Sequence, residues 1–168
     1  MSDLYYAKPA PLTPTIQRIG RVESFFSATG VVVRHGGNRA YYSVSTDHVQ
    51  MPPIESFHDP ESYYATLAHE TTHATKHPTR LDRDFGRKRW VDEGYAMEEL
   101  VAELGAAFLS ADLELTPEPR AEHASYIESW LNVLKADSRA ILTAASHAQR
   151  AADFLHGLQT PAEAEAAA

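Results

Sequence analysis

The residues best suited to chemistry in this chain are His69, Glu70 and His73, which form the pattern H-E-x-x-H. On a helix, side chains four positions apart lie on one face, with Cβ atoms about 6 Å apart. Two imidazoles arranged in this way can bind one zinc ion, each through a ring nitrogen at about 2.0–2.1 Å. The glutamate between them can polarise a water molecule on that ion. The pattern predicts a zinc site with Glu70 as the general base of a hydrolysis reaction.

The competing interpretation is a helix that carries two surface histidines and a glutamate by chance. The flanking sequence supports at least the helix. Asp59 is a typical N-cap residue, and Pro60 suits the first helical position. Pro78 disfavours helical backbone at His77, which predicts a helix over residues 60–77.

A third metal ligand has to come from another part of the chain. His77 is four residues beyond His73, but a third turn lies about 5.4 Å further along the helix axis, which argues against it. Residues 95–109 form a second predicted helix that is rich in acids. Its candidate ligands are Glu98, Glu99 and Glu103, and its predicted buried stripe is Met97, Leu100, Val101, Leu104 and Phe108.

The spacing of these acids suggests a division of roles. Glu99 and Glu103 are four residues apart and share a helix face. Glu99 can bind the metal while Glu103 accepts the free ring N–H of a ligand histidine, an arrangement that fixes the tautomer. Glu98 is rotated by about 100° from Glu99, so we expect it to face solvent or to cap the helix. The alternative for the whole segment is a solvated acidic face.

Four runs of sequence, in this order, resemble the metallopeptidase domain of the ArdC family of plasmid antirestriction proteins. They are AYYSVSTDHVQMP, YYATLAHETTHATKH, RLDR and YAMEELVAELGAAFL, and the resemblance extends over residues 16–157. Related domains occur in phage and plasmid polyvalent proteins. The resemblance implies a zincin-like fold of the gluzincin type, with His69, His73 and Glu99 as zinc ligands and Glu70 as the base.

The same family carries a single-stranded-DNA-binding domain before this domain, whereas only about 15 residues precede the first predicted helix here. A formal net charge of −8 also disfavours direct DNA binding by this chain alone. The most basic segment, residues 80–89, could border the cleft. Its simpler interpretation is a solvated loop whose arginines pair with Asp82, Asp84 and Asp92.

Composition indicates one domain of 168 residues without cysteine, and hence without a disulfide framework or thiolate ligands. The sequence has no apolar run long enough to span a membrane and no signal peptide, so we expect a cytoplasmic protein. The predicted boundaries are an N-terminal arm over residues 1–15, the domain over 16–157 and a flexible tail over 158–168.

The remaining pattern predicts an α+β fold. A helix is expected over residues 16–28, followed by short strands that begin near Val31, at residues 40–43 and at residues 48–51. Three short strands before the metal-binding helix suggest a small antiparallel sheet. Two further helices are expected near residues 120–135 and 137–157, which gives four to five helices in all.

The predicted function is metal-assisted hydrolysis of a peptide or protein substrate. An edge strand, residues 40–44 or 48–51, could hold an extended peptide by backbone pairing, with Tyr41 or Tyr42 near the metal. Tyr95, Tyr126 and His123 are candidates for stabilising the oxyanion. Two other classes stay open, namely a metal-stabilised binding module without turnover and an antirestriction factor.

Overall fold

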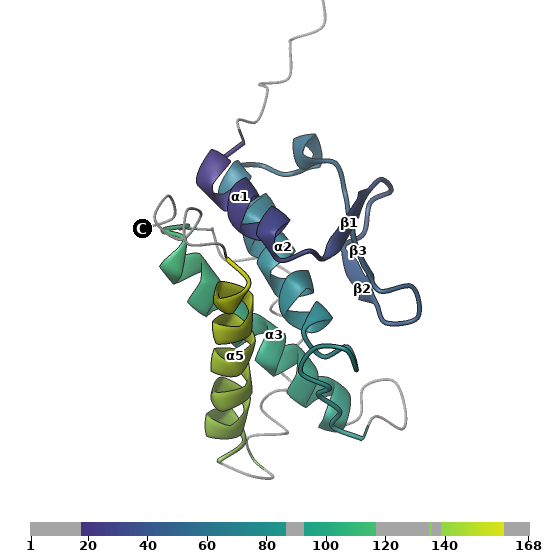
Figure 1. Ribbon diagram of the computed structural model, residues 1–168, viewed down its shortest axis with the longest axis vertical. Helices are drawn as coiled ribbons and strands as arrows, with labels where there is room; N and C mark the ends of the chain where they lie inside the picture. Colours follow the sequence, from purple (N-terminus) through teal and green to yellow (C-terminus); the bar gives the residue numbers. More distant parts are fainter. Residues whose placement is uncertain (1–17, 87–92, 117–134, 136–138, 160–168) are drawn as a thin grey trace, which may run out of the picture.

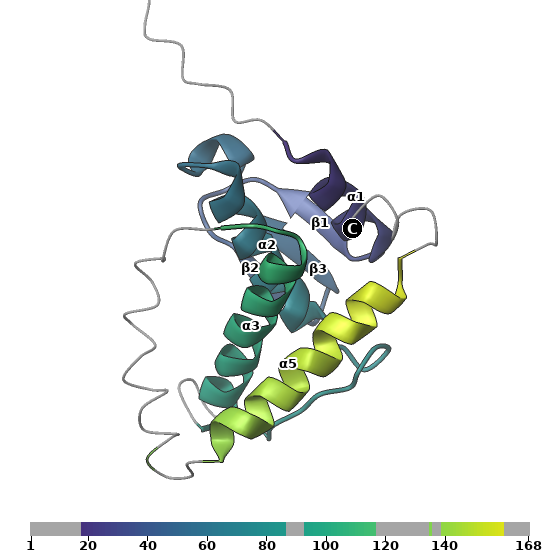
Figure 2. The same cartoon turned by 90° about the vertical axis from the view of Figure 1, so that its left-hand side faces the viewer.

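The computed structural model describes residues 18–86, 93–116, 135 and 139–159, and its elements form successive layers. A small sheet packs against α2 (Pro60–Ala74), α2 packs against α3 (Glu93–Asp112), and α3 packs against α5 (Ala140–Gly157). Figure 1 shows α2 between the sheet on one side and α3 and α5 on the other, and in Figure 2 α3 and α5 lie in front of α2 and the sheet. The helix that carries H-E-x-x-H is therefore the central element of an α+β fold.

The sheet has three strands, as the sequence predicts, but it is mixed rather than antiparallel. The strands β1 (Val32–His35), β2 (Tyr41–Ser43) and β3 (His48–Met51) lie in the order β1-β3-β2. β3 pairs in parallel with β1 and antiparallel with β2. The turn after β1 carries the chain past the end of β3, where the Gly36 N–H donates to the Met51 carbonyl at 2.9 Å. β1 and β2 are consequently not a hairpin.

The core joins the sheet to the helices through large side chains on α1 (Gly20–Ala28), β3 and α2. From position 63 to position 74 every residue of α2 is buried, because the helix is covered on both sides. The largest fully buried side chains include Tyr63, Tyr64, Phe25, Met51 and Val49. This burial contradicts the alternative in which the two histidines of α2 lie on the protein surface.

The first turn of α2 forms as predicted, but the helix ends earlier than predicted. The Asp59 side chain accepts a hydrogen bond from the Ser62 N–H at 2.6 Å, which caps the N-terminus. At the other end, helix geometry stops at Ala74, three residues before His77. Side chains from the following turn bond to the last carbonyls, with Arg80 donating to Ala74 at 2.9 Å. These contacts satisfy carbonyls that a helix end leaves unpaired.

The other helices agree with the predicted positions within a few residues. α1 begins at Gly20 rather than residue 16, because Ile19 has extended backbone. α3 is longer at both ends than residues 95–109, and α5 ends at Gly157 as predicted. The helix predicted near residues 120–135, the N-terminal arm and nearly all of the tail lie outside the described residues. Across the described helices, none is both long and apolar enough to cross a membrane.

Candidate metal centre

Three predicted ligands, His69 and His73 from α2 and Glu99 from α3, lie together in the structure and are all buried. The Nε2 atom of His69 lies 3.5 Å from Glu99 Oε2, and the Nε2 atom of His73 lies 3.4 Å from Glu99 Oε1. Both imidazoles therefore direct the same ring nitrogen at one carboxylate. The cluster forms because the i,i+4 face of α2 packs against α3 at the turn that carries Glu99.

These separations fit one small divalent ion. Tetrahedral ligands bonded at about 2.0–2.1 Å to one ion lie about 3.3–3.4 Å from one another. The two histidine–carboxylate distances, 3.4 and 3.5 Å, match that value, and the three donor atoms all lie within 4.8 Å of one another. Two imidazole nitrogens and one carboxylate form the donor set of catalytic zinc sites, in which water takes the fourth position.

The expectation that Glu98 faces solvent is wrong. Glu98 is buried, and its Oε1 lies 2.9 Å from the Nδ1 atom of His73, within hydrogen-bonding distance. A carboxylate in this position holds the outer ring nitrogen of a metal-binding histidine and directs the other nitrogen inward. Glu98 is rotated by about 100° from Glu99 around the helix axis. This rotation places its carboxylate at the outer ring nitrogen of His73, Nδ1, rather than in solvent.

Arg83 holds Glu98 in place, a role that the sequence did not suggest. Its guanidinium donates to both carboxylate oxygens, with Nε–Oε2 at 2.8 Å and Nη2–Oε1 at 2.9 Å. The remaining donors reach the Thr75 hydroxyl at 3.0 Å and the Thr72 carbonyl at 3.2 Å. This planar, two-point grip on a carboxylate is particular to arginine. Arg83 thus links the loop after α2 to both metal-binding helices.

Glu103 lies on the outer side of the other histidine, but the predicted hydrogen bond is not formed, because among the described residues His69 Nδ1 has no partner with hydrogen-bond geometry. Its Oε1 is 3.3 Å from His69 Nδ1, a longer contact than the one between Glu98 and His73. Each imidazole consequently has Glu99 near its inner nitrogen and a different glutamate near its outer nitrogen. The sequence indicated one such outer carboxylate, and the structure has two.

The buried charges strongly perturb these groups. Burial by itself would lower the pKa of His73, but the hydrogen bonds to Glu98 and Glu99 outweigh burial and raise it to about 9. Burial would raise the pKa of Glu98, yet its bonds to His73 and Arg83 lower it to about 2. Burial would also raise the pKa of Glu99, but its hydrogen bonds to His69 and His73 lower it. The cluster is therefore an anionic environment that attracts protons and divalent cations alike.

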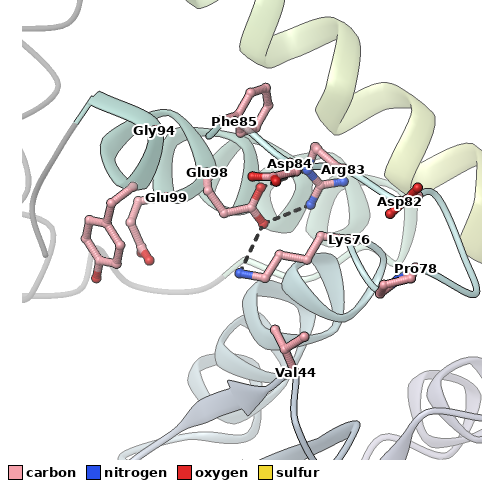
Figure 3. Close-up of a pocket in the computed structure, with 11 residues that line it drawn as sticks. Val44, Lys76, Pro78, Asp82, Arg83, Asp84, Phe85, Gly94, Glu98 and Glu99 are labelled. Carbon is pink, nitrogen blue, oxygen red and sulfur yellow. Dashed lines mark hydrogen bonds and ion pairs between the residues drawn. The ribbon is translucent and has the colours of Figure 1, made fainter. Parts of the chain in front are cut away.

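A cavity of about 310 Å³ lies beside the metal cluster, between the end of α2 and the start of α3. Figure 3 shows Glu98 and Glu99 on the α3 side of this cavity, opposite Lys76 and Val44. Tyr95, one of the predicted oxyanion-stabilising residues, also lines it. The other two, Tyr126 and His123, lie outside the described residues.

The two predicted substrate-binding tyrosines belong to β2, an edge strand within the described residues. The side chain of Tyr41 is exposed, whereas Tyr42 is half-buried and donates its hydroxyl to Asp47 at 2.8 Å. Val44, directly after β2, lines the cavity beside Glu99. The alternative edge, residues 48–51, is the central strand and is paired on both sides, so it cannot receive a peptide.

The basic segment differs from the sequence interpretation in its partners. Arg80 pairs with Asp47 in the turn between β2 and β3, at 2.8 and 3.0 Å, and Arg83 pairs with Glu98. Neither arginine pairs with the neighbouring acids at 82 and 84, while residues 87–92 lie outside the described part. His77 lies beyond the end of α2, with Nδ1 2.8 Å from the Thr79 hydroxyl. The signal that was missed is a pair of arginines in the loop after a buried helix, from which Arg83 reaches the buried Glu98.

Comparison with known proteins relates this chain to one protein family and to two solved structures. The family described as zincin-like metallopeptidase matches residues 20–147. Two crystal structures of the antirestriction protein ArdC from plasmid R388 are similar to this chain. The Mn(II)-bound structure has a TM-score of 0.77 and 45% identity, and it covers 84% of this chain and 53% of that one. The metal-free structure has a TM-score of 0.74 and 44% identity, with 85% and 53% covered.

Two curated relatives are much longer than the region they share with this chain. The uncharacterized protein y4eC of Sinorhizobium fredii is 48% identical over 161 residues, which are 96% of this chain and 52% of that protein. A DNA primase TraC of Escherichia coli is 39% identical over 142 residues, 84% of this chain but 13% of the primase. The chain thus spans about half the length of y4eC and a much smaller share of the primase.

Proposed function

Because this chain belongs to the zincin-like metallopeptidase family, we propose that it is a metal-dependent peptidase. The observation that carries the proposal is the convergence of His69, His73 and Glu99 at the ligand spacing of one small ion. A hydrolase also needs a base beside that ion and an open space for substrate. The H-E-x-x-H pattern supplies Glu70, and the cavity that borders Glu99 supplies the space.

In this proposal His69, His73 and Glu99 hold the ion, and each remaining residue has a separate task. A divalent ion in such a site acidifies a water molecule and polarises the scissile carbonyl. Glu70, which is buried next to His69, accepts the proton from the attacking water and transfers it to the leaving amine. Glu98 and Glu103 keep the imidazoles in the tautomer that leaves Nε2 free for the ion.

The proposal assigns zinc as the ion, since two imidazoles and one carboxylate are typical of catalytic zinc sites. The similar R388 protein has a Mn(II)-bound structure, so manganese is the main competitor. Elemental analysis of protein purified without added metal, followed by titration of chelator-treated protein with each ion, distinguishes the two. We expect one zinc ion per chain. A preference for manganese under both conditions would replace zinc.

The proposed substrate is a peptide or protein that lies extended along β2, with Tyr41 and Tyr42 as contacts. Support comes from the unpaired edge of β2 within the described residues and from Val44, which continues this strand into the cavity. A proline at the β2 residue whose N–H points away from β3 should raise KM while leaving metal content unchanged, because proline cannot donate a hydrogen bond. Normal cleavage by such a variant would remove the strand from the mechanism.

Tyr95 is the proposed stabiliser of the oxyanion, since it lines the cavity together with Glu99. A hydroxyl that donates to the developing negative charge contributes mainly to kcat, because it acts in the transition state. Tyr95→Phe should therefore lower kcat about 10²–10³-fold with little change in metal content. A KM effect alone would make Tyr95 a substrate contact only.

The decisive test of hydrolysis is Glu70→Gln, which keeps the size of the side chain but removes its basicity. We expect full metal content, an unchanged fold and loss of cleavage. Cleavage can be followed by mass spectrometry of a proteome-derived peptide mixture with zinc-loaded protein. If wild-type protein cleaves no more of the mixture than Glu70→Gln does, the peptidase proposal fails.

The similarity to an antirestriction protein favours a second candidate function, protection of DNA from restriction without turnover. The same variant separates the two functions. Under the second candidate, Glu70→Gln should protect incoming DNA in cells as well as wild type does, while a ligand variant such as His73→Ala should fail. For either function, a cytoplasmic location and a lack of direct DNA binding by this chain stay predictions from the sequence.

A further inference from the structure

The cavity beside Glu99 contains a cation that the metal centre does not use, Lys76. Figure 3 shows its side chain extending from the end of α2 toward Glu98 on the opposite wall. The Lys76 ammonium is 3.9 Å from Glu98 Oε1, beyond normal hydrogen-bonding distance. Among the residues that the structure describes, no closer acidic partner of Lys76 is found.

Glu98 is a poor partner for Lys76 because its charge is already engaged. Oε1 contacts His73 and accepts from Arg83, both at 2.9 Å, and Oε2 accepts from Arg83 at 2.8 Å. A buried, two-point arginine contact largely offsets the charge of a carboxylate. The ammonium of Lys76 therefore keeps its three donors available for a group that enters the cavity.

Three further acids line the cavity, and their surroundings decide how much they compete. Glu99 lies between the two histidines, with its oxygens 3.5 and 3.4 Å from their Nε2 atoms. Asp82 and Asp84 are both exposed, and the Asp84 carboxylate accepts the Gly86 N–H at 2.8 Å. Charges in contact with water are strongly screened. The Lys76 side chain is only 24% exposed, so its interaction with a bound group is screened less. To an anion that enters the cavity, Lys76 therefore offers donors that its described neighbours do not occupy.

We propose that Lys76 makes this cavity a binding subsite for a carboxylate of the substrate, namely a glutamate or aspartate side chain next to the scissile bond. The inference rests on the proposed peptidase function and adds the class of substrate. The cavity borders Glu99, so a side chain inside it belongs to a residue adjacent to the bond over the ion. Val44 and Phe85 supply apolar walls for the methylene groups of that side chain.

The test measures binding without turnover. Three synthetic peptide hydroxamates serve as probes, identical except that the side chain next to the metal-binding hydroxamate is glutamyl, glutaminyl or lysyl. Their Kd values are measured by calorimetry on zinc-loaded protein of confirmed metal content. We expect wild type to bind the glutamyl probe at least about tenfold more tightly than the glutaminyl probe, as for one charge-assisted hydrogen bond. Lys76→Gln should abolish this difference, and Lys76→Glu should make the lysyl probe the tightest.

The matched control for Lys76→Glu is Arg150→Glu, which makes the same change in net charge at an exposed position of α5. This control should keep the wild-type ranking of the three probes. An unchanged ranking in Lys76→Gln would overturn the proposal. So would tightest binding of the lysyl probe by wild type, since Asp82 and Asp84 would then set the specificity. If the expected ranking holds but the matching peptides are not cleaved, the subsite stands and the peptidase function fails. If no probe binds to metal-loaded protein, both fail.

Discussion

At the scale of single residues, the two histidines of the metal centre differ in the groups behind them. His73 contacts Glu98, which Arg83 grips at two points, whereas His69 contacts Glu103 at a longer distance. Both outer carboxylates can fix the tautomer of their imidazole, and loss of such a group usually costs metal affinity. Among the described residues, only Glu98 of these two glutamates also pairs with a buried cation, the guanidinium of Arg83. The two glutamates should therefore have similar effects on metal binding and different effects on stability.

We predict that Glu98→Gln and Glu103→Gln each weaken zinc binding about 10–100-fold, because each removes a charged acceptor from a ligand histidine. Competition with a chromogenic chelator measures the affinity. Glu55→Gln, which changes an exposed glutamate far from the cluster in sequence, is the control and should bind zinc as wild type does. Wild-type affinity in Glu98→Gln would mean that the contact with His73 does not orient the ring.

Stability of the metal-free protein should separate the same two positions. Removal of Glu98 leaves the Arg83 side chain, which is 3% exposed, without its counterion. Breaking a buried pair in this way costs about 3–5 kcal/mol. We predict a loss of this size for Glu98→Ala and for Arg83→Met in urea unfolding with chelator present, and a smaller loss for Glu103→Ala. The double variant Arg83→Met/Glu98→Ala should lose less than the sum of the two single losses, because the residues are coupled.

At the scale of elements, the metal centre depends on how closely α2 and α3 approach. Gly105 on α3 faces Thr72, which is fully buried and precedes His73 on α2. A Cβ atom at position 105 would lie 2.5 Å from Thr72 Cγ2 and 2.8 Å from Thr72 Oγ1. The Thr72 hydroxyl donates to the Ala68 carbonyl at 2.8 Å, which holds the side chain in this rotamer. The absence of a side chain at Gly105 thus lets Glu99 come within reach of both histidines.

We predict that Gly105→Ala destabilises the protein by about 1–3 kcal/mol through overpacking, although alanine favours a helix by about 1 kcal/mol over glycine. Zinc affinity should fall as well, because the helices that carry the ligands move apart. Gly20→Ala, which has no atom within 4 Å of the new Cβ, is the control and should not destabilise. Adding Thr72→Ala to Gly105→Ala should recover part of the loss; no recovery would contradict the proposed contact.

At the scale of the whole molecule, one polar network connects the sheet layer to the helical layers. Asp47, in the turn between β2 and β3, accepts two bonds from Arg80 and one from the Tyr42 hydroxyl. Arg80 also caps the end of α2. The network therefore fixes the edge strand β2 relative to the helix that carries the metal ligands. Its strength should depend on the charge of Asp47.

We predict that this connection weakens in acid. The hydrogen bond from Arg80 outweighs the effect of burial and lowers the pKa of Asp47. An acid with a lowered pKa in the folded state stabilises the fold above its unfolded pKa of about 3.9, and this contribution is lost as the pH falls through the folded value. Asp47→Asn should thus lower Tm at pH 7 and have a progressively smaller effect below about pH 4.

The measurement is Tm against pH, with chelator present in every sample so that metal binding does not contribute. Asp47 has a φ of 44°, a conformation that asparagine also tolerates, so the substitution tests charge rather than backbone strain. Asp153→Asn, at an exposed carboxylate on α5, is the control. A Tm difference between wild type and Asp47→Asn that stays constant from pH 7 to pH 3 would exclude a role for ionised Asp47.

The sequence by itself determined the elements and the residues on their faces, because both follow from local periodicity. The i,i+4 spacing of His69 and His73 requires only a helix, and Asp59 with Pro60 begins that helix as predicted. The acidic helix, with Glu99 and Glu103 one turn apart, follows from the same periodicity. In α5 the same periodicity places Ala148, Ala152 and Leu155 on one side, and all three are buried, whereas Ile141 on that side is 43% exposed.

Only the tertiary structure decided which side chains from separate elements meet. Local pattern cannot show that Arg83 crosses to Glu98, because the contact depends on how a loop folds back over two helices. For that reason Glu98 was expected in solvent, and α2 was predicted to continue to His77 although arginine side chains cap it earlier. The mixed order of the sheet has a similar cause. Strand signals in the sequence locate each strand along the chain. The path of the chain past the end of β3 decides which strands pair and whether they pair in parallel or antiparallel.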